Sequence, residues 1–249
     1  MNNIQTELLD IFKVLEKIII ENNLSYFCSS GTCLGAIRHK GFIPWDDDMD
    51  IFMPRDDYET LIKITHKYTG EYFFGTPLDK DYLYPFMKFY SKKYPYVETR
   101  CKKKYRKYNY LYIDIFPLDY ISDNNVKHNV RKSFILRKIL FIKGTISKSK
   151  MLNLTKFILA PIIPIRVSSI KKKMNKLGVN TKTNTMMDIC WGTKPFRSSY
   201  FENYIEVPFE NIMVRVPQGY DGYLSAVYGD YMKLPEEKDR RSHELMKLE

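Results

Sequence analysis

A cluster of four aspartates constrains this chain more than any other feature. Asp46, Asp47 and Asp48 are consecutive, and Asp50 follows after a single methionine. Carboxylates packed this closely repel one another, and their burial is costly unless a cation lies among them. Because the candidate ligands are all carboxylates, Mg²⁺ or Mn²⁺ is the cation that suits them best. The cluster therefore predicts a divalent metal site.

The residues around the last two aspartates alternate between polar and apolar. A strand over 47–53 would place Asp48 and Asp50 on one face of a sheet and the intervening apolar residues on the other. Two carboxylates with an apolar back form half of a metal clamp for phosphoryl transfer. We therefore predict Asp48 and Asp50 as metal ligands and catalytic residues. Asp46 and Asp47 are expected to support them by capping or by hydrogen bonding to the ligands.

Small residues precede the aspartates. An apolar strand is expected over 24–29 and a short helix over 31–37, with Ser30, Gly31 and Thr32 at the turn between them. Small residues leave backbone N–H groups accessible to an anion, and the start of a helix adds its dipole. We predict that these three residues bind the phosphates of a donor substrate.

Three basic residues are further candidates for phosphate binding. Arg38 and Lys40 lie between the small-residue turn and the aspartates, where a solvated basic loop is the alternative interpretation. Lys88 lies in the middle of an expected strand over 86–90, and a lysine in such a core position needs an anionic partner.

A second acidic strand is predicted over 110–116, closed by Pro117. In such a strand Tyr110, Tyr112 and Asp114 share one face. Asp114 is therefore expected beside Asp48 and Asp50 as a third metal ligand or a general base. Additional strands are expected over 72–76 and 97–101, and helices over 2–22, 55–67 and 220–228.

The net charge is concentrated in one part of the chain. The whole sequence has 40 Lys and Arg against 29 Asp and Glu, yet in 121–183 Asp123 is the only acid among 15 basic residues. Helices are expected there over 126–143, 151–160 and 168–177. Aliphatic residues between the lysines suit an anionic membrane surface. A solvated helical insertion and a nucleic-acid-binding segment are the alternatives, although no nucleic-acid-binding motif is present.

The four cysteines form no C-x-x-C pair, which argues against structural zinc and favours buried or free thiols in a reducing compartment. The N-terminus does not have the pattern of a signal peptide, and no apolar run reaches the ~20 residues that span a bilayer. We therefore expect a cytoplasmic protein, with peripheral contact at the inner face of the membrane left open.

The run from Ser30 to Asp50 resembles the signature of the LicD family of phosphotransferases, which is related to fukutin and fukutin-related protein within the nucleotidyltransferase superfamily. Asp114–Asp119 and the stretch 216–235 resemble its other motifs. The resemblance implies an α/β fold, with a mixed sheet of nucleotidyltransferase type flanked by helices. We expect a catalytic core over 1–120, a basic helical insertion over 121–183, and a C-terminal part over 184–249 that completes the catalytic domain.

The resemblance also implies an activity. The expected reaction is metal-dependent transfer of phosphocholine from CDP-choline to a hydroxyl of a cell-surface glycan or its lipid-linked precursor, with release of CMP. Teichoic acid, capsule and lipopolysaccharide are such glycans. CDP-ribitol and CDP-glycerol are the rival donors, and Trp45, Tyr82, Tyr84, Tyr90 and Tyr112 are candidates for an aromatic face that binds choline.

Two other functional classes remain open from the sequence. One is a nucleotidyltransferase that acts on a metabolite or a nucleic acid and releases pyrophosphate. The other is a membrane- or nucleic-acid-binding protein without catalytic activity, in which Asp48 would be dispensable.

Overall fold

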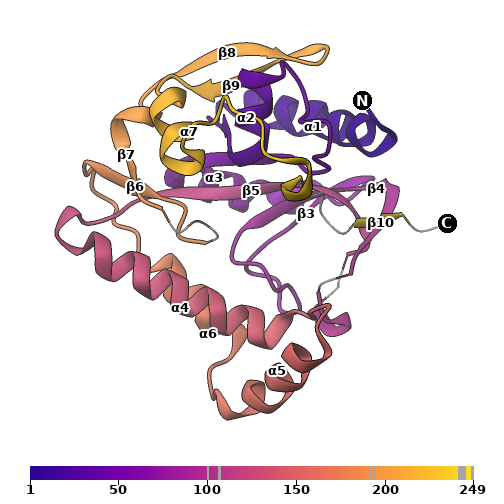
Figure 1. The fold of residues 1–249 in the computed structure, drawn as a ribbon, viewed down its shortest axis with the longest axis vertical. Helices are drawn as coiled ribbons and strands as arrows, with labels where there is room; N and C mark the ends of the chain where they lie inside the picture. The colour runs from indigo at the N-terminus through magenta and orange to yellow at the C-terminus, as the bar shows by residue number, and fades with distance from the viewer. Residues whose placement is uncertain (100, 106–107, 191, 193, 241–244, 248–249) are drawn as a thin grey trace.

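In the part of the chain that the computed structural model describes (residues 1–99, 101–105, 108–190, 192, 194–240 and 245–247), eight strands form one mixed sheet (Figure 1). These strands are β1 (Phe27–Cys28), β2 (Asp50–Pro54), β3 (Tyr72–Gly75), β4 (Met87–Glu98), β5 (Tyr110–Tyr120), β6 (Thr185–Met187), β7 (Phe196–Arg197) and β10 (Leu245–Lys247). The main order is β1-β2-β5-β4-β10, while β3 pairs with β4, and β6 joins β5 to β7. The hairpin of β8 (Tyr204–Phe209) and β9 (Ile212–Pro217) is separate.

The register of the three central strands determines the position of the acidic residues. β2 runs parallel to β5 and places Asp50 opposite Asp114. β4 runs antiparallel to β5 on its other side and places Lys88 opposite Asp114. Residues opposite one another on neighbouring strands point to the same face. Three charged side chains therefore lie in one row across the sheet.

Helices flank this sheet, which confirms the predicted α/β class. They are α1 (Asn3–Glu21), α2 (Ser30–Arg38), α3 (Arg55–Ile64), α4 (Val126–Gly144), α5 (Lys150–Ile162), α6 (Val167–Asn175) and α7 (Tyr220–Tyr228). α1 begins with a capping box at Asn2 and buries an apolar stripe that includes Leu8 and Phe12. α1 packs against β4 and β5, and α3 packs against β2 and β5.

The basic segment 121–183 is helical, as predicted, and lies below the sheet in Figure 1, with α5 at the lower tip. α4 packs against α6 and α5. Ser133 of α4 donates a hydrogen bond from Oγ to the carbonyl of Ile189 at 2.6 Å. Lys171 of α6 is buried and donates from Nζ to the carbonyl of Tyr82 at 2.8 Å. Buried polar contacts thus attach this segment to the rest of the domain.

Several strand boundaries differ from the prediction. The strand expected over 24–29 is reduced to Phe27–Cys28, and β3 ends one residue early, at Gly75. β2 begins at Asp50 rather than at 47, so Asp48 lies in the loop before the strand. β5 continues past Pro117 to Tyr120, because Pro117 pairs with Met53 of the parallel strand and loses only its own hydrogen-bond donor. The strands expected over 86–90 and 97–101 form a single strand, β4, with an irregularity between Ser91 and Pro95.

The four cysteines are free and buried, as expected. No single helix in the described part of the chain is long and apolar enough to span a bilayer.

Candidate active site

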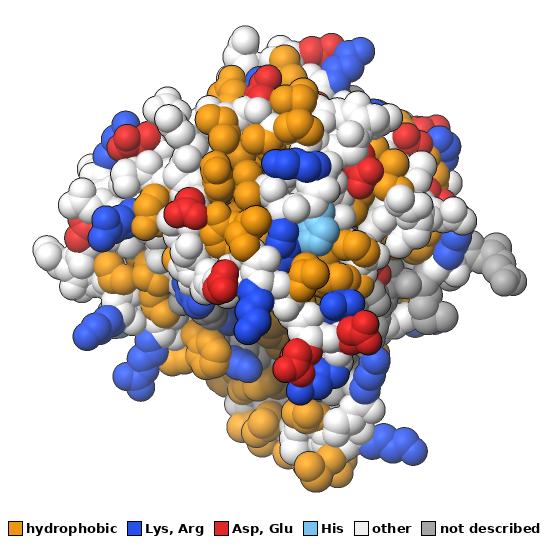
Figure 2. All heavy atoms as spheres, turned by 45° about the horizontal axis from the view of Figure 1, so that its top comes forward, with side chains coloured by type: hydrophobic (Ala, Val, Ile, Leu, Met, Phe, Trp, Pro, Cys, Tyr) orange, Lys and Arg blue, Asp and Glu red, His pale blue; other side chains and the backbone are white. Residues whose placement is uncertain are grey.

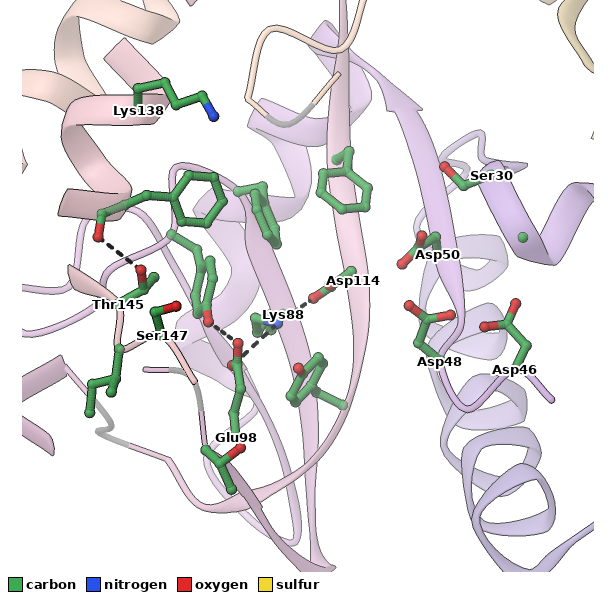
Figure 3. A pocket seen from close by; sticks show the side chains of 18 of the residues that line it. Ser30, Asp46, Asp48, Asp50, Lys88, Glu98, Asp114, Lys138, Thr145 and Ser147 are labelled. Carbon is green, nitrogen blue, oxygen red and sulfur yellow. Dashed lines mark hydrogen bonds and ion pairs between the residues drawn. The ribbon is translucent and has the colours of Figure 1, made fainter. Parts of the chain in front are cut away.

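A cavity of about 990 Å³ lies between the sheet and the connection from α4 to α5 (Figure 3). Its acidic wall consists of Ser30, Gly31, Asp46, Asp48, Asp50 and Tyr228. Its floor consists of Tyr84, Phe86, Lys88, Glu98, Tyr112, Asp114 and Phe116. Its basic wall consists of Lys138, Phe141, Thr145, Ser147, Lys148 and Lys156, with apolar neighbours Ile142 and Ile146.

Local hydrogen bonds hold the acidic wall in place. The N–H of Asp50 donates to Oγ1 of Thr32 at 2.8 Å, and its carbonyl accepts from the N–H of Ser29 at 3.0 Å. These bonds tie the start of β2 to the start of α2. Gly31 allows Asp46 to approach that helix start, because a Cβ at position 31 would lie 2.4 Å from Oδ2 of Asp46. A carboxylate in this position interacts favourably with the helix dipole.

The C-terminal motif supports the same helix start. Ser30 has a φ of 46°, a left-handed conformation that costs energy for any residue with a Cβ. The N–H of Ser30 donates to the hydroxyl of Tyr223 at 2.8 Å, which helps to hold this conformation. Arg38, at the other end of α2, donates from Nη1 to the carbonyl of Tyr231 at 2.6 Å. The stretch after β9 therefore positions both ends of α2.

The acidic wall is electrostatically unfavourable by itself. Burial raises the pKa of Asp50 well above its usual value, and the negative charges of Asp48, Asp114 and Asp46 raise it further. Burial also raises the pKa of Tyr228, and Asp50 is the largest of the charges that add to this effect. Positive charge delivered by a ligand or metal would relieve this repulsion.

Lys88 is the centre of the floor. Its side chain is only 2% exposed, and Nζ lies 2.8 Å from Oδ1 of Asp114 and 4.0 Å from Oε2 of Glu98. Nζ also lies 3.4 Å from the ring centre of Tyr112 and 4.3 Å from that of Tyr84. The hydroxyl of Tyr84 donates to Oε1 of Glu98. One lysine thus links two carboxylates and two aromatic faces, as Figure 3 shows in part.

The basic wall was not predicted as part of the site. Lys156 donates from Nζ to Oγ1 of Thr145 at 2.9 Å, and burial lowers the pKa of Lys156. The charge pattern of 121–183 indicated an anionic partner, but no residue spacing in it pointed to a cavity. Packing of this segment over the sheet brings the lysines opposite the aspartates.

The structure brings six of the predicted site residues to one cavity: Ser30, Gly31, Asp48, Asp50, Lys88 and Asp114. Three others lie outside the lining described above. Thr32 is buried and positions β2, and Arg38 holds the C-terminal stretch. Lys40 contributes its carbonyl, which accepts from the N–H of Glu210 at 2.8 Å. The predicted phosphate-binding role thus has no support from the position of these three residues.

The five aromatic candidates for choline binding also separate into residues that line the cavity and residues that do not. Tyr84 and Tyr112 lie on the cavity floor. Tyr82 and Tyr90 are buried in the core. The guanidinium carbon of Arg240 lies 4.7 Å from the centre of the Trp45 ring.

A Mg²⁺ or Mn²⁺ ion fits the acidic wall by its chemistry rather than by a preformed cage. Among the described residues, no three His, Cys, Asp or Glu side chains converge closely enough to hold an ion. Mg²⁺, however, usually binds one or two carboxylates and fills its other positions with water and substrate phosphate. Asp48 and Asp50 have the required oxygens, and the repulsion at Asp50 is what a cation would relieve.

The family model described as LicD/FKTN/FKRP, nucleotidyltransferase domain, matches residues 23–157, which is more than half of the chain. The chain belongs to the LicD family. The match extends beyond the motifs recognised in the sequence and includes every residue of the basic wall.

Individual relatives agree with this assignment. The lipopolysaccharide cholinephosphotransferase LicD of Haemophilus influenzae is 28% identical over 248 residues, covering 95% of this chain and 93% of that protein. Uncharacterised proteins of Rickettsia prowazekii and Rickettsia typhi are 44% identical over 50 residues, or 20% of this chain and 19% and 16% of their own lengths. This chain is a LicD-type phosphotransferase.

Proposed function

We propose that this enzyme transfers phosphocholine from CDP-choline to a hydroxyl of a cell-surface glycan, such as lipopolysaccharide, or of its lipid-linked precursor. The similarity to a lipopolysaccharide cholinephosphotransferase along almost the whole chain supports this choice of substrates. The observation that carries the proposal is the strand register, which places Asp50, Asp114 and Lys88 side by side on three strands that line one cavity. The cavity volume of about 990 Å³ suits a nucleotide-activated donor.

Asp48 and Asp50 are the proposed ligands of Mg²⁺ or Mn²⁺, with Asp114 beside them. When bound there, the metal would offset the negative charge of the donor diphosphate and of the departing CMP. Ser30 and Gly31, at the first turn of α2, are the proposed contacts to the donor phosphates.

Asp114 is the proposed general base. The acceptor hydroxyl oxygen attacks the phosphorus that carries choline, and its proton passes to the carboxylate of Asp114. The bond from that phosphorus to the bridging oxygen of the diphosphate breaks, and CMP leaves with the electron pair. Lys88, with Nζ 2.8 Å from Oδ1 of Asp114, holds this carboxylate in position.

The floor has a charge that suits choline. Lys88 lies between two carboxylates, Asp114 and Glu98, which leaves an excess of one negative charge when all three are ionised. A quaternary ammonium binds well beside a carboxylate and an aromatic ring. Lys88 already covers one face of Tyr84 and one face of Tyr112, so Glu98 is the group proposed to attract choline. Ribitol and glycerol are neutral, so they could donate hydrogen bonds to Glu98 but would gain no charge–charge attraction from it. Glu98 is therefore proposed to select choline.

Product analysis tests the proposal. The enzyme is incubated with Mg²⁺, an acceptor glycan, and CDP-choline, CDP-ribitol or CDP-glycerol in separate reactions, and CMP and the modified glycan are measured. We expect transfer from CDP-choline. Transfer only from CDP-ribitol or CDP-glycerol would overturn the donor, and release of pyrophosphate from CTP would indicate a nucleotidyltransferase instead.

A substitution at Glu98 separates the donors further. Glu98→Gln keeps the hydrogen-bonding shape and removes the charge, so we expect about a tenfold higher KM for CDP-choline, consistent with ~1.4 kcal/mol of lost cation binding. Any residual use of CDP-ribitol should keep its KM. Equal effects on both donors would contradict the selection by charge.

A further inference from the structure

α5 is an apolar helix that the fold leaves uncovered. None of its residues, all of which the structure describes, is buried. Four apolar residues at helical spacing form one stripe with large exposed fractions: Met151 at 75%, Leu154 at 60%, Ile158 at 52% and Ile162 at 67%. Phe157, beside this stripe, is 77% exposed. Contiguous exposure on this scale marks an interaction surface.

Polar contacts hold α5 so that this stripe faces outward. Lys143 of α4 donates from Nζ to the carbonyl of Ala160 at 2.9 Å. Asn153 donates from Nδ2 to the carbonyl of Ser147 at 2.7 Å. Lys156 points away from the stripe and donates to Thr145 in the cavity. The helix is thus fastened by its polar side, and its apolar side is available.

Positive charge surrounds the helix. Lys102 donates from Nζ to the carbonyl of Ile142 at 3.3 Å, Lys143 donates to that of Ala160, and Lys156 donates to Thr145, so these three lysines lie where α4 meets α5. Outside 121–183 the chain has more acidic than basic residues, 28 against 25. The positive end of the molecule therefore coincides with its most exposed apolar helix. Figure 2 shows hydrophobic side chains at the lower end, with Lys and Arg nearby.

We propose that α5 binds the surface of an anionic lipid bilayer, with its apolar stripe inserted among the acyl chains and the neighbouring lysines at the headgroups. A second copy of this chain is the weaker occupant, because the lysine clusters of two copies would repel each other. A membrane span also fits poorly. α5 and α6 are long and apolar enough to cross a bilayer only when taken together, and they are bent by 84° relative to each other. α6 also buries Val167, Ile170 and Met174 within the fold.

The position of α5 connects the membrane to the site. Ile146, Ser147 and Lys148, which precede α5, and Lys156 within it line the cavity. A bilayer at α5 would therefore lie beside the cavity on its basic side. If the proposed function holds, this arrangement presents a lipid-linked acceptor to Asp114 from the basic wall.

Co-sedimentation with vesicles tests the proposal independently of the substrates. The full chain is mixed with vesicles of phosphatidylcholine alone or with phosphatidylglycerol added, and we expect binding that requires the anionic lipid. Leu154→Gln/Ile158→Gln should weaken this binding about tenfold or more. The matched control Leu78→Gln/Met213→Gln, at positions 78% and 48% exposed outside the basic segment, should bind like the wild type.

Other results would contradict the membrane proposal or identify a different occupant of α5. Absence of binding to either vesicle, or equal binding by the α5 variant, would overturn the proposal. A dimer in sedimentation velocity runs without lipid that the α5 variant dissociates would identify a second copy as the occupant. Thermal melting confirms that the exposed substitutions leave the fold intact. A failed donor assignment would leave the vesicle results unchanged, so the two proposals fail separately.

Discussion

The two walls of the cavity differ in origin as well as in charge. Apart from Tyr228, the acidic wall comes from residues 30–50, where a hydrogen bond between α2 and β2 positions Asp50. The basic wall comes from residues 138–156, nearly a hundred positions later, and depends on the packing of α4 against α5 and α6 on the side of the cavity opposite the acidic residues. The carboxylates of the acidic wall repel one another, and so do the lysines of the basic wall. Under the proposed function, a bound metal would offset the charge of the acidic wall, and the donor phosphates would offset that of the basic wall.

The largest expected effect lies on the acidic wall. Asp50→Asn should lower the rate of transfer about 100-fold or more, because it removes a proposed metal ligand. The same change should raise the melting temperature. Burial and neighbouring carboxylates raise the pKa of Asp50 in the folded state, so its ionised form costs stability at neutral pH.

The matched control for this change is Asp56→Asn, at an exposed position at the start of α3. It should not alter the rate, and it should lower the melting temperature slightly if at all, because a carboxylate in the first turn of a helix is mildly stabilising. An Asp50→Asn enzyme that keeps more than a tenth of the wild-type rate would contradict the role of the acidic wall.

The next effect tests the floor. Lys88→Met should lower the transfer rate at least tenfold and the free energy of unfolding by about 1–3 kcal/mol, since Asp114 loses its charged partner. Urea denaturation and initial rates provide the two measurements. Adding Asp114→Asn should restore part of the stability but none of the activity. A double variant as unstable as the sum of the two single variants would argue against their coupling.

A smaller effect is expected on the basic wall. Lys156→Met should raise the KM for an anionic acceptor several-fold, up to about tenfold, while kcat changes little, because the charge lies at the edge of the reacting groups. Raising the salt concentration should reduce the difference between the variant and the wild type. A fall in kcat without a change in KM would place Lys156 in the chemistry instead.

The smallest expected effect concerns Lys171, a buried lysine of the basic segment that does not belong to the basic wall. Burial lowers the pKa of Lys171 from its usual value to about 8. The unfolded state therefore binds more protons between about pH 8 and 10.5, and this residue makes the free energy of unfolding rise with pH in that window. Lys171→Met should flatten the rise. The exposed neighbour serves as control, since Lys172→Met should leave the slope unchanged.

Features that depend on residues close together in the sequence were predicted better than features that depend on distant partners. α7 begins and ends where its apolar spacing predicted, and α1 differs by a single residue at each end. The placement of Asp50 and Asp114 on one face of the sheet also followed from strand periodicity. The extension of β5 past Pro117 did not, because its partner Met53 lies more than sixty positions away.

Asp114 and Asp119 illustrate the same limit within one strand. Both belong to the motif of residues 114–119, and strand alternation with Tyr110 and Tyr112 predicted only Asp114 as a site residue. Asp114 faces the cavity, whereas Asp119 is buried against Arg55, with its two oxygens each 2.6 Å from guanidinium nitrogens. Strand alternation separates their faces, but only the position of α3 shows what Asp119 binds.

The sequence by itself determined the family, the α/β class, the acidic wall and the helical character of the basic segment, because periodicity and short motifs act through neighbours in the chain. The tertiary structure decided which candidates meet. It placed Lys88 between Asp114 and Glu98, assigned Thr32 and Arg38 to positioning contacts, and brought a wall of lysines over the sheet. Such contacts depend on packing between distant segments, for which one chain has no local signal.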